Sequence, residues 1–424
     1  MLKKLLLLGV STGTLELVRY AKSQGIHVII TDNLPDAHVS IKSLADEVWN
    51  ISTNDLDALE QACRIHGVHG VFAGVSEFNL DMVKELTTRL GLPCYFDYSA
   101  WGIARDKFKF KYYCKQVGVP VSEDYALHGY PTDKEINKIK FPVVVKPVDK
   151  SSNRGLSFCS TKEELLVAID KVKTISDNEN IIIERKLEGI ELTAYYAIAE
   201  GKSSLVSLYS DLAEPDTPNY CYTLNSSVSN RLLSQYLETV NAKVMEFIST
   251  IGCRDGIVWF EIMYDKDNQF YFLEMGHRLP GDMMFMPLHG VTGFNSIAWL
   301  VDYSLGVVHR AQDLPQTQLK PYDKCACSYY LWSKKSATIC HNEELKQLCD
   351  SPDFYVHIIR DINQSVEAFS PIVAITFSSN DYASMCATIK QLNKIQVLDE
   401  NEDDILIHFT DFDELDKLYY TSVS

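Results

Sequence analysis

The sequence predicts a multi-lobed protein that combines the α/β and α+β classes, with a parallel sheet first and further lobes after it. From Lys4 to about Pro93, short apolar runs alternate with amphipathic stretches, as in strand–helix units that build a parallel sheet. The length of 424 residues exceeds one typical core, and 46% hydrophobic with 23% charged residues is an ordinary globular composition. We therefore expect several packed lobes.

The first region shows where its elements lie. Strands are expected over 5–8, 28–31 and 71–73, and helices over 15–23 and 56–66. The first ten residues superficially resemble a secretion signal, but the apolar run is short and no small-residue cleavage site follows it. The turn from Gly9 to Gly13, together with Asp32, resembles half of a dinucleotide fingerprint. A tight strand-to-helix turn and a nicotinamide site both remain open.

Charge and cysteine usage limit the classes of partner. The net charge of -17 argues against nucleic acid and anionic membranes, because phosphate groups are bound mainly by Lys and Arg. No segment has the apolar length needed to cross a bilayer. The eleven cysteines lack paired metal-ligand spacing, which favours reduced thiols over a disulfide framework. We expect a cytoplasmic protein with no nucleic-acid or membrane partner.

The middle of the chain predicts a helix followed by several strands. The helix begins at Asp106, carries Lys107, Lys109 and Lys111, and ends at Gly118 before Pro120. Strands are expected over 141–146, 155–159, 180–185, 256–264 and 270–275, with a helix over about 162–172. From about residue 318 to the C-terminus, strands and helices alternate again.

Two apolar strands each deliver one carboxylate. Glu261 ends one run and Glu274 ends the next, with the turn 265–268 between them. If these strands pair antiparallel, the two carboxylates lie close together, which is unfavourable without a cation. Magnesium held by one or two carboxylates and substrate phosphates fits this arrangement. The alternative is a pair of unrelated surface carboxylates.

The apolar strand 141–146 ends in Lys146, and a small polar loop follows it up to Gly155. A buried lysine needs an anionic partner, and a loop of this kind suits backbone N–H contacts with phosphates. The alternative is a lysine that extends from the strand end to solvent. A third segment, from Glu184 to Glu191, can offer backbone groups to a purine and a carboxylate to a ribose.

In this order, the segments resemble the ATP-grasp superfamily, and within it the carboxylate–amine ligases such as L-amino acid ligases and carbamoyl-phosphate-synthetase-like single chains. The resemblance covers about residues 4 to 306, with a looser likeness beyond. It implies a pre-ATP-grasp domain over 1–100, an ATP-grasp domain over 101–310 and a C-terminal α+β lobe over 311–424. Within the second domain it implies a nucleotide lid over about 120–190 and a metal-binding core over about 191–310.

The resemblance also assigns roles to residues. It implies that Lys107 and Lys146 reach the ATP phosphates, and that Arg278 steadies a phosphate or the tetrahedral intermediate. The loop 149–155, with Ser151, Ser152 and Gly155, corresponds to the mobile phosphate loop. Further roles by resemblance are adenine recognition by Glu184, Arg185 and Leu187, ribose binding by Glu191, and magnesium binding by Glu261 and Glu274.

One departure concerns the metal site. The family has Glu-Ile-Asn after the second metal strand, with the Asn as a third metal contact, whereas this chain has Glu274-Met-Gly276-His277. The third ligand is therefore missing, or it is replaced by water or by His277, so the resemblance implies one or two magnesium ions, for which Mn²⁺ can substitute. The phosphate loop is also poor in glycine. Glu77 is expected to face a substrate amine, and His289 and the segment 282–286 to line the acceptor pocket.

The resemblance implies an ADP-releasing ligase that phosphorylates a carboxylate and then joins it to an amine through an acyl phosphate. Its substrates would be small carboxylates and amines, such as amino acids, and the family suggests a homodimer. Three alternatives remain: a bicarbonate-activating ATP-grasp carboxylase, a nucleotide-binding protein without catalysis, and a Rossmann-type oxidoreductase.

Overall fold

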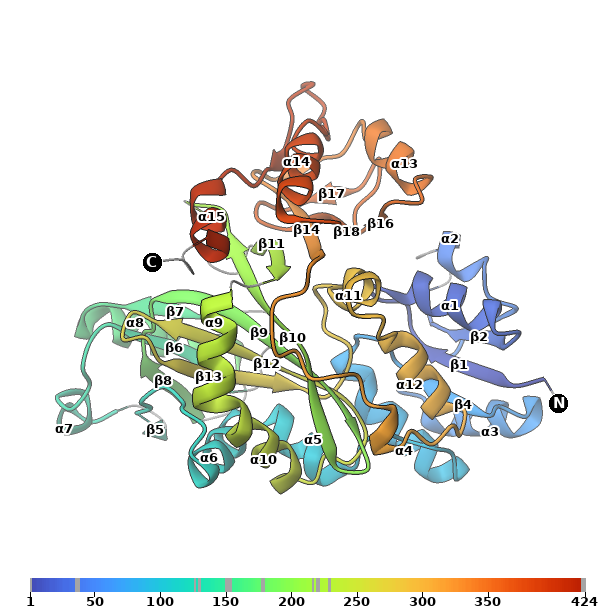
Figure 1. The fold of residues 1–424 in the computed structure, drawn as a ribbon, viewed down its shortest axis with the longest axis horizontal. Helices are drawn as coiled ribbons and strands as arrows, with labels where there is room; N and C mark the ends of the chain where they lie inside the picture. The colour runs from blue at the N-terminus through green and yellow to red at the C-terminus, as the bar shows by residue number, and fades with distance from the viewer. Residues whose placement is uncertain are drawn as a thin grey trace.

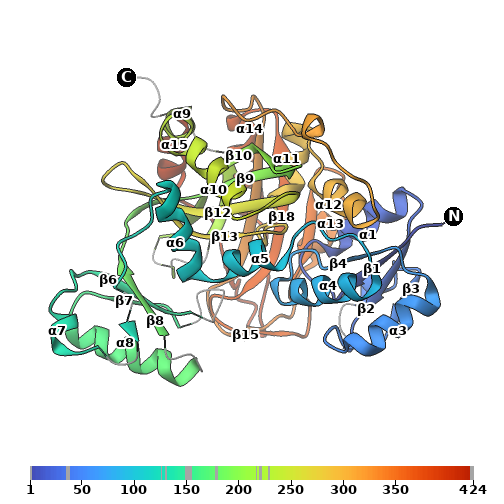
Figure 2. The same cartoon turned by 90° about the horizontal axis from the view of Figure 1, so that it is seen from below.

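The computed structural model describes residues 2–34, 39–125, 127–128, 131–148, 155–176, 180–215, 217–218, 222–227 and 230–420. A parallel sheet and a small antiparallel lobe lie at opposite ends of the molecule, and a large antiparallel sheet lies between them (Figures 1 and 2). The C-terminal segment forms the lobe at the top of Figure 1. These elements agree with the predicted combination of α/β and α+β lobes.

The first sheet has the strand order β3-β2-β1-β4, and all its pairs are parallel. Its strands are β1 (Lys4–Leu8), β2 (His27–Thr31), β3 (Glu47–Trp49) and β4 (Gly70–Phe72). The helices of this region are α1 (Thr14–Ser23), α2 (Val39–Lys42), α3 (Leu56–His66) and α4 (Glu77–Leu90). The N-terminal leucine run is thus an inner strand of the sheet, as predicted.

The partial dinucleotide fingerprint is a tight turn whose acidic residue already has a partner. Gly9 and Gly13 have φ values of 74° and 81°, which favour glycine. The buried Asp32 carboxylate lies 3.5 Å from the ammonium group of the buried Lys42. An acid in this pair is not free to bind a ribose, so the structure favours the interpretation as a tight strand-to-helix turn.

The small lobe, which we define as β5 to β8 with α7 and α8, is an antiparallel sheet in the order β5-β8-β6-β7. Its strands are β5 (Leu127–His128), β6 (Val143–Pro147), β7 (Ser157–Cys159) and β8 (Asn180–Arg185), and its helices are α7 (Asp133–Ile136) and α8 (Lys162–Ile175). Val143 and Val145 point into its separate core with Leu165 and Ile169. Because side chains alternate along a strand, Lys146 lies on the opposite face of β6.

The large sheet has the order β13-β12-β9-β10-β11-β14-β18-β16, with β19 beside β14. Its strands are β9 (Gly189–Ala199), β10 (Lys202–Ala213), β11 (Tyr222–Ser227), β12 (Gly256–Asp265), β13 (Phe270–Gly276), β14 (Cys325–Ser333), β16 (Tyr355–Ile358), β18 (Pro371–Ser379) and β19 (Leu406–Ile407). A separate two-stranded sheet pairs β15 (Ala337–Thr338) with β17 (Ser365–Val366). The large sheet therefore joins the β12–β13 hairpin, which carries Glu261 and Glu274, to the C-terminal lobe.

Aromatic contacts fix helices on one face of this sheet. Phe110 of α6 (Lys107–Val117), Phe247 of α10 (Ala242–Thr250) and Phe260 of β12 form a cluster with ring centroids 5.5 to 6.4 Å apart. The remaining helical elements are α5 (Tyr98–Arg105), α9 (Asn230–Tyr236), the π-helix η1 (Leu237–Asn241), α11 (Phe285–Thr292), α12 (Ser296–Ser304), the 3₁₀-helix η2 (Ala311–Asp313), α13 (Glu343–Cys349), α14 (Tyr382–Leu392) and α15 (Phe412–Tyr420). Among the described residues, no helix is both long and apolar enough to span a membrane.

The helix α6 has the predicted ends. The Asp106 carboxylate accepts hydrogen bonds from the backbone N–H groups of Phe108 and Lys109, so Asp106 caps the helix. Gly118 ends it with a φ of 75°. This fixed N-terminus places Lys107 at the first helical position, close to β12 and β13.

Candidate functional site

The strands β12 and β13 pair antiparallel, and Glu261 lies directly opposite Glu274. This confirms the predicted juxtaposition of two carboxylates on one face of a hairpin. Burial, together with the charges of Glu274 and Glu191, raises the pKa of Glu261 well above its ordinary value. A positive charge between the two carboxylates would reverse this effect, so the arrangement suits a cation.

Lys107 supplies one positive charge at this place. Its ammonium nitrogen lies 3.3 Å from Oε2 of Glu274, and its side chain is 19% exposed. A cation in the first turn of a helix is unfavourable for the helix dipole, and the contact with Glu274 offsets that effect. The structure thus brings Lys107, Glu261 and Glu274 together, three of the residues predicted to bind phosphate or metal.

A second group of charges joins the small lobe to α6. Lys146 and Lys111 each form an ion pair with the buried Glu184, on different carboxylate oxygens. The hydroxyl group of Ser122 donates a hydrogen bond of 2.6 Å to the oxygen that Lys111 contacts. We call Lys111, Ser122, Lys146 and Glu184 the paired cluster. It contains two of the predicted site residues, Lys146 and Glu184.

The electrostatics of the paired cluster are balanced. Burial alone would raise the pKa of Glu184, but the charges of Lys146 and Lys111 outweigh burial and hold that pKa well below its ordinary value. Burial lowers the pKa of Lys111, whereas for Lys146 the Glu184 carboxylate outweighs burial and raises it. Lys111 and Ser122 were not predicted from the sequence as partners of Glu184. The spacing of four residues between Lys107 and Lys111, which places both on one helix face, was the available signal.

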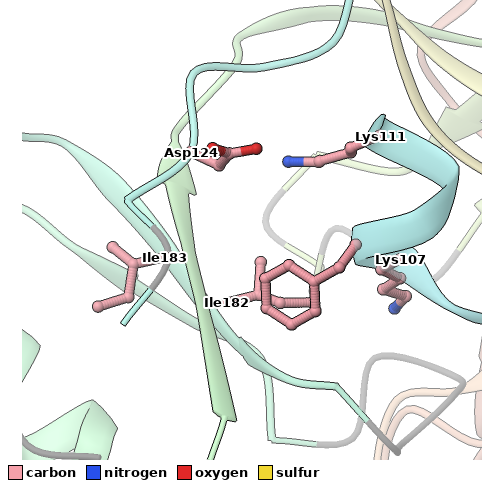
Figure 3. A pocket seen from close by; sticks show the side chains of 6 residues that line it. Lys107, Lys111, Asp124, Ile182 and Ile183 are labelled. Carbon is pink, nitrogen blue, oxygen red and sulfur yellow. The ribbon is translucent and has the colours of Figure 1, made fainter. Parts of the chain in front are cut away.

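A pocket lies between α6 and β8, lined by Lys107, Phe108, Lys111, Asp124, Ile182 and Ile183. Figure 3 shows the two lysines extending from the same helix, with the two isoleucines and Asp124 across from it. An apolar wall beside two lysines has the chemistry required for a planar base and its phosphates. The pocket itself has room for about one water molecule, so it marks one wall of the candidate nucleotide site rather than the whole site.

The predicted adenine and ribose residues follow β8. The backbone N–H of Arg185 donates to the carbonyl oxygen of Glu123 at 2.9 Å, and its guanidinium lies 3.1 Å from Asp265. Leu187 lies in the connection between β8 and β9, and Glu191 stands half-buried on β9. The side chain of Arg185 therefore points to the β12–β13 turn, and since its N–H is already bonded to Glu123, only its backbone carbonyl remains as a candidate for adenine.

The phosphate loop is described only at its end. Ser151 and Ser152 lie outside the described residues. Gly155 has a φ of 83°, and a Cβ atom there would lie 2.2 Å from Cδ1 of Ile175. The position therefore requires glycine, which fixes the point where the loop enters β7.

Arg278 lies beyond β13 in a largely buried setting. Its side chain is 13% exposed, its guanidinium is 5.0 Å from the centre of the Trp259 ring, and one nitrogen lies 3.6 Å from Glu77. Glu77, expected to face a substrate amine, thus faces Arg278 in the structure. Both groups border the space between the first sheet and the large sheet.

His277 is not placed to bind a metal at this site, so its prediction as a replacement ligand is wrong. The side chain is fully buried, and its Nε2 atom lies 3.0 Å from the backbone oxygen of Asp255. Burial lowers the pKa of His277 to about 4. The imidazole packs against the rings of Tyr95 and Phe96. Because side chains alternate along the chain at the end of β13, His277 points away from the face that carries Glu274.

Further acids share the face of the large sheet with Glu261. In the strand register, Glu261 lies beside Thr193, which lies beside Tyr209, while Glu191 lies beside Asp211. The Tyr209 hydroxyl donates a hydrogen bond of 2.6 Å to Asp282. We call this set the acidic face; its members are Glu191, Asp211, Glu261, Glu274 and Asp282. Asp282 was predicted to line the acceptor pocket, whereas Asp211 was missed, although it is the one acid inside the apolar run 205–213.

The two aspartates of the acidic face have hydrogen-bond donors as partners and no ion pair among the described residues. Thr193 donates a hydrogen bond of 2.8 Å to Asp211, and Asn225 donates a second. Burial raises the pKa of Asp211 well above its ordinary value, and burial also raises the pKa of Asp282. No Lys or Arg of the described ranges forms an ion pair with either aspartate. The face can therefore receive a cationic group of a ligand.

Other residues predicted near the acceptor pocket do not all face it. Met283, Met284 and Phe285 are buried in the core, with exposures of 2% or less. His289 is exposed on α11 and lines a different pocket with Glu16 and Arg19. Of the predicted segment, Asp282 is the residue in contact with the acidic face.

The donor set fits magnesium better than a softer metal. Glu261 and Glu274 offer carboxylate oxygens, which hard divalent cations prefer. Within the described part of the chain, no group of three or more His, Cys, Asp and Glu residues is arranged to hold a metal ion. The two carboxylates would therefore share a magnesium ion with water and nucleotide phosphates.

Comparisons with known proteins agree with this geometry. Residues 139–285 match the ATP-grasp domain family. A D-alanine–D-alanine ligase of Halalkalibacterium halodurans is 34% identical over 93 residues, which are 22% of this chain and 30% of the ligase. The ligase of the same name from Actinobacillus pleuropneumoniae is 24% identical over 258 residues, covering 57% of this chain and 80% of the ligase. The chain thus spans less than a third of the first relative and most of the second.

Solved structures share the fold over nearly the whole chain. The L-amino acid ligase of Bacillus licheniformis superposes with a TM-score of 0.77 at 17% identity, covering 94% of this chain and 99% of the ligase. A biotin carboxylase of Campylobacter jejuni gives a TM-score of 0.75 at 17% identity, covering 94% and 92%. At this identity the likeness concerns the fold alone, and it extends through the C-terminal lobe.

Proposed function

The chain carries an ATP-grasp domain and is related in sequence to ATP-dependent ligases, and on this premise we propose that it is a carboxylate–amine ligase. It uses ATP and magnesium to form an amide or peptide bond through an acyl phosphate, and it releases ADP and phosphate. The observation that carries the proposal is the direct pairing of Glu261 with Glu274, with Lys107 at 3.3 Å from Glu274.

The first step transfers the γ-phosphoryl group of ATP. A carboxylate oxygen of the substrate attacks the γ-phosphorus, the bond to the β–γ bridging oxygen breaks, and ADP leaves. Lys107 and Lys146 hold the phosphates, and a magnesium ion held by Glu261 and Glu274 would supply further charge neutralisation there. Ser151, Ser152 and Gly155 belong to the loop that covers the phosphates and keeps water away from the acyl phosphate.

The adenosine part of ATP lies along the wall that α6 and β8 provide, and the small pocket there widens to admit it. Ile182 and Phe108 provide apolar contact for the base, the backbone of Arg185 and Leu187 meets its edge, and Glu191 binds the ribose. Glu184 holds Lys146 and Lys111 in position through its two carboxylate oxygens.

The second step joins the amine. The amine nitrogen attacks the activated carbonyl carbon, the carbon–oxygen bond to phosphate breaks, and the amide forms as the nitrogen gives up one proton, which the released phosphate can take. Arg278 stabilises the charge of the tetrahedral intermediate. Asp211 and Asp282 attract the cationic amine substrate before it is deprotonated, because no lysine or arginine of the described residues forms an ion pair with them, although the charge of Arg278 acts on Asp282.

The same acidic face disfavours bicarbonate as the group that is phosphorylated. The ammonium group of an amino acid would be attracted by Asp211 and Asp282, whereas bicarbonate has no cationic group to pair with them. We therefore propose small carboxylates and amines, such as amino acids, as the substrates. We also propose that the protein is cytoplasmic and forms a homodimer. Neither nucleic acid nor a membrane is a proposed partner.

Isotope transfer tests the acyl-phosphate route. A carboxylate substrate labelled with ¹⁸O in its carboxyl group should pass one labelled oxygen to each phosphate released, as measured by mass spectrometry. Unlabelled phosphate, with amide formed at the normal rate, would contradict the route. Labelled phosphate that appears without any amide would instead point to hydrolysis of the acyl phosphate.

A further inference from the structure

The number of metal ions at the site follows from the residue that faces Gly276. Gly276 lies directly opposite Trp259 in the β12–β13 pair. A Cβ atom on Gly276 would lie 2.2 Å from Cζ2 and 2.7 Å from Nε1 of Trp259. Approaches below 3.0 Å are not tolerated between these atoms, so the indole fills the space that a side chain at position 276 would need.

Trp259 is held firmly in that place. The residue is 6% exposed, and the guanidinium of Arg278 lies over its ring at 5.0 Å. Such a cation–π contact favours one ring orientation when both groups are desolvated. Glu261 follows Trp259 by two residues on the same face of β12, so the indole borders the carboxylate pair.

The neighbouring side chains supply no substitute ligand. His277 is buried and faces Asp255, on the other side of the strand. Lys107 contacts Oε2 of Glu274 at 3.3 Å, so one oxygen of that carboxylate already has a positive partner. Glu274 thus has the Lys107 ammonium group as its partner. Position 276 offers the two glutamates no third oxygen ligand.

We infer that this site binds one magnesium ion through Glu261 and Glu274, and that the ammonium group of Lys107 supplies the positive charge that a second ion would bring. Trp259 excludes the second ion by filling the place of its ligand. The inference rests on the proposed function, because the nucleotide phosphates complete the coordination of the single ion. It goes beyond that function by fixing the metal stoichiometry.

Counting bound Mn²⁺ tests the inference without any measurement of activity. The full chain is mixed with the non-hydrolysable ATP analogue AMP-PNP, with protein in excess, and Mn²⁺ is titrated while electron paramagnetic resonance reports the free ion. We expect one Mn²⁺ per complex of protein and analogue. Two Mn²⁺ per complex would overturn the inference and leave the proposed ligase intact.

Calorimetry of AMP-PNP binding separates the two hypotheses. Failure of the analogue to bind would contradict the proposed function itself, and bound analogue that retains no Mn²⁺ would contradict the metal site as a whole. Tight analogue binding with a single Mn²⁺ supports both.

A double variant tests the role of Trp259. Trp259→Ala combined with Gly276→Asn should raise the count from one Mn²⁺ to two, whereas Trp259→Ala alone should remain at one. A folded double variant that still binds one ion would show that Trp259 does not exclude the second. The wild-type count keeps the inference testable even if the double variant does not fold.

Discussion

Two groups of buried charges lie on either side of the candidate nucleotide pocket, and they differ in their balance. In the paired cluster, Glu184 has two lysines and one hydroxyl as partners. In the acidic face, Lys107 is the one lysine that contacts a carboxylate in the described structure, at Glu274. The difference indicates that the first group stabilises the protein by itself, whereas the second requires ligands.

The largest expected effect comes from the acidic face. Glu274→Ala removes the carboxylate that Lys107 contacts and that the metal requires, so ADP formation should fall by about 10³-fold, the usual scale for losing such electrostatic stabilisation. Initial rates of ADP release measure this. Glu343→Ala, at an exposed glutamate of α13 beside His341, is the control and should remain close to wild type. Near-normal rates for Glu274→Ala would contradict the proposed metal site.

The next effect concerns the stability of the paired cluster. Lys111→Met leaves one oxygen of the buried Glu184 without its cation, and breaking a buried pair in this way costs about 3–5 kcal/mol. Urea unfolding followed by circular dichroism measures the loss. Lys115→Met on the same helix removes only an exposed pair with Asp124 and should cost about 1 kcal/mol or less. Equal losses in both variants would show that the cluster is not a stabilising unit.

The two groups should respond oppositely to pH. The pKa of Asp211 is raised in the folded state, so the folded protein binds more protons than the unfolded chain above about pH 4, and stability falls as pH rises through the folded pKa. The pKa of Glu184 is lowered, so its contribution is present above the unfolded pKa of about 4.3 and is lost as pH falls below it.

Thermal unfolding of the metal-free protein between about pH 5 and 8 tests the first of these effects. Each unit of pKa shift corresponds to about 1.4 kcal/mol. Asp211→Asn should flatten the decline of the unfolding temperature with pH, whereas Asp350→Asn, at an exposed position at the end of α13, should leave the profile unchanged. Parallel profiles for all three proteins would contradict an uncompensated charge at Asp211.

The smallest expected effect distinguishes backbone from side chain at the adenine position. Arg185→Ala removes the contact with Asp265 but keeps the backbone, so affinity for AMP-PNP should change by less than about threefold, well under 1 kcal/mol. Calorimetric titration measures this change. A loss of tenfold or more would show that the guanidinium itself binds the nucleotide.

Much of the fold and part of the site could be predicted from the sequence. The parallel sheet, the helix from Asp106 to Gly118 and the hairpin with Glu261 opposite Glu274 depend on local patterns, such as periodicity, caps and strand ends. Lys107 was assigned through the family resemblance, which places a phosphate-binding lysine at the start of the helix that Asp106 caps.

Other features depend on contacts between distant segments. Lys111 meets Glu184 from 73 positions away, and Tyr209 meets Asp282 across the same distance. No local pattern reports such pairs. His277 was predicted as a ligand from its position next to Gly276, but strand alternation and burial place it on the other face. Trp259 gave no signal in the sequence, because its effect on position 276 appears only when the strands pair.

The most direct test of the proposed ligase is the release of ADP and phosphate from magnesium-ATP across a panel of amino acids, singly and in pairs, with bicarbonate as a separate arm. We expect release that requires a carboxylate substrate and is stimulated by an amine, with the amide as product. ADP release that depends on bicarbonate and needs no amino acid would contradict the ligase proposal and favour a carboxylase.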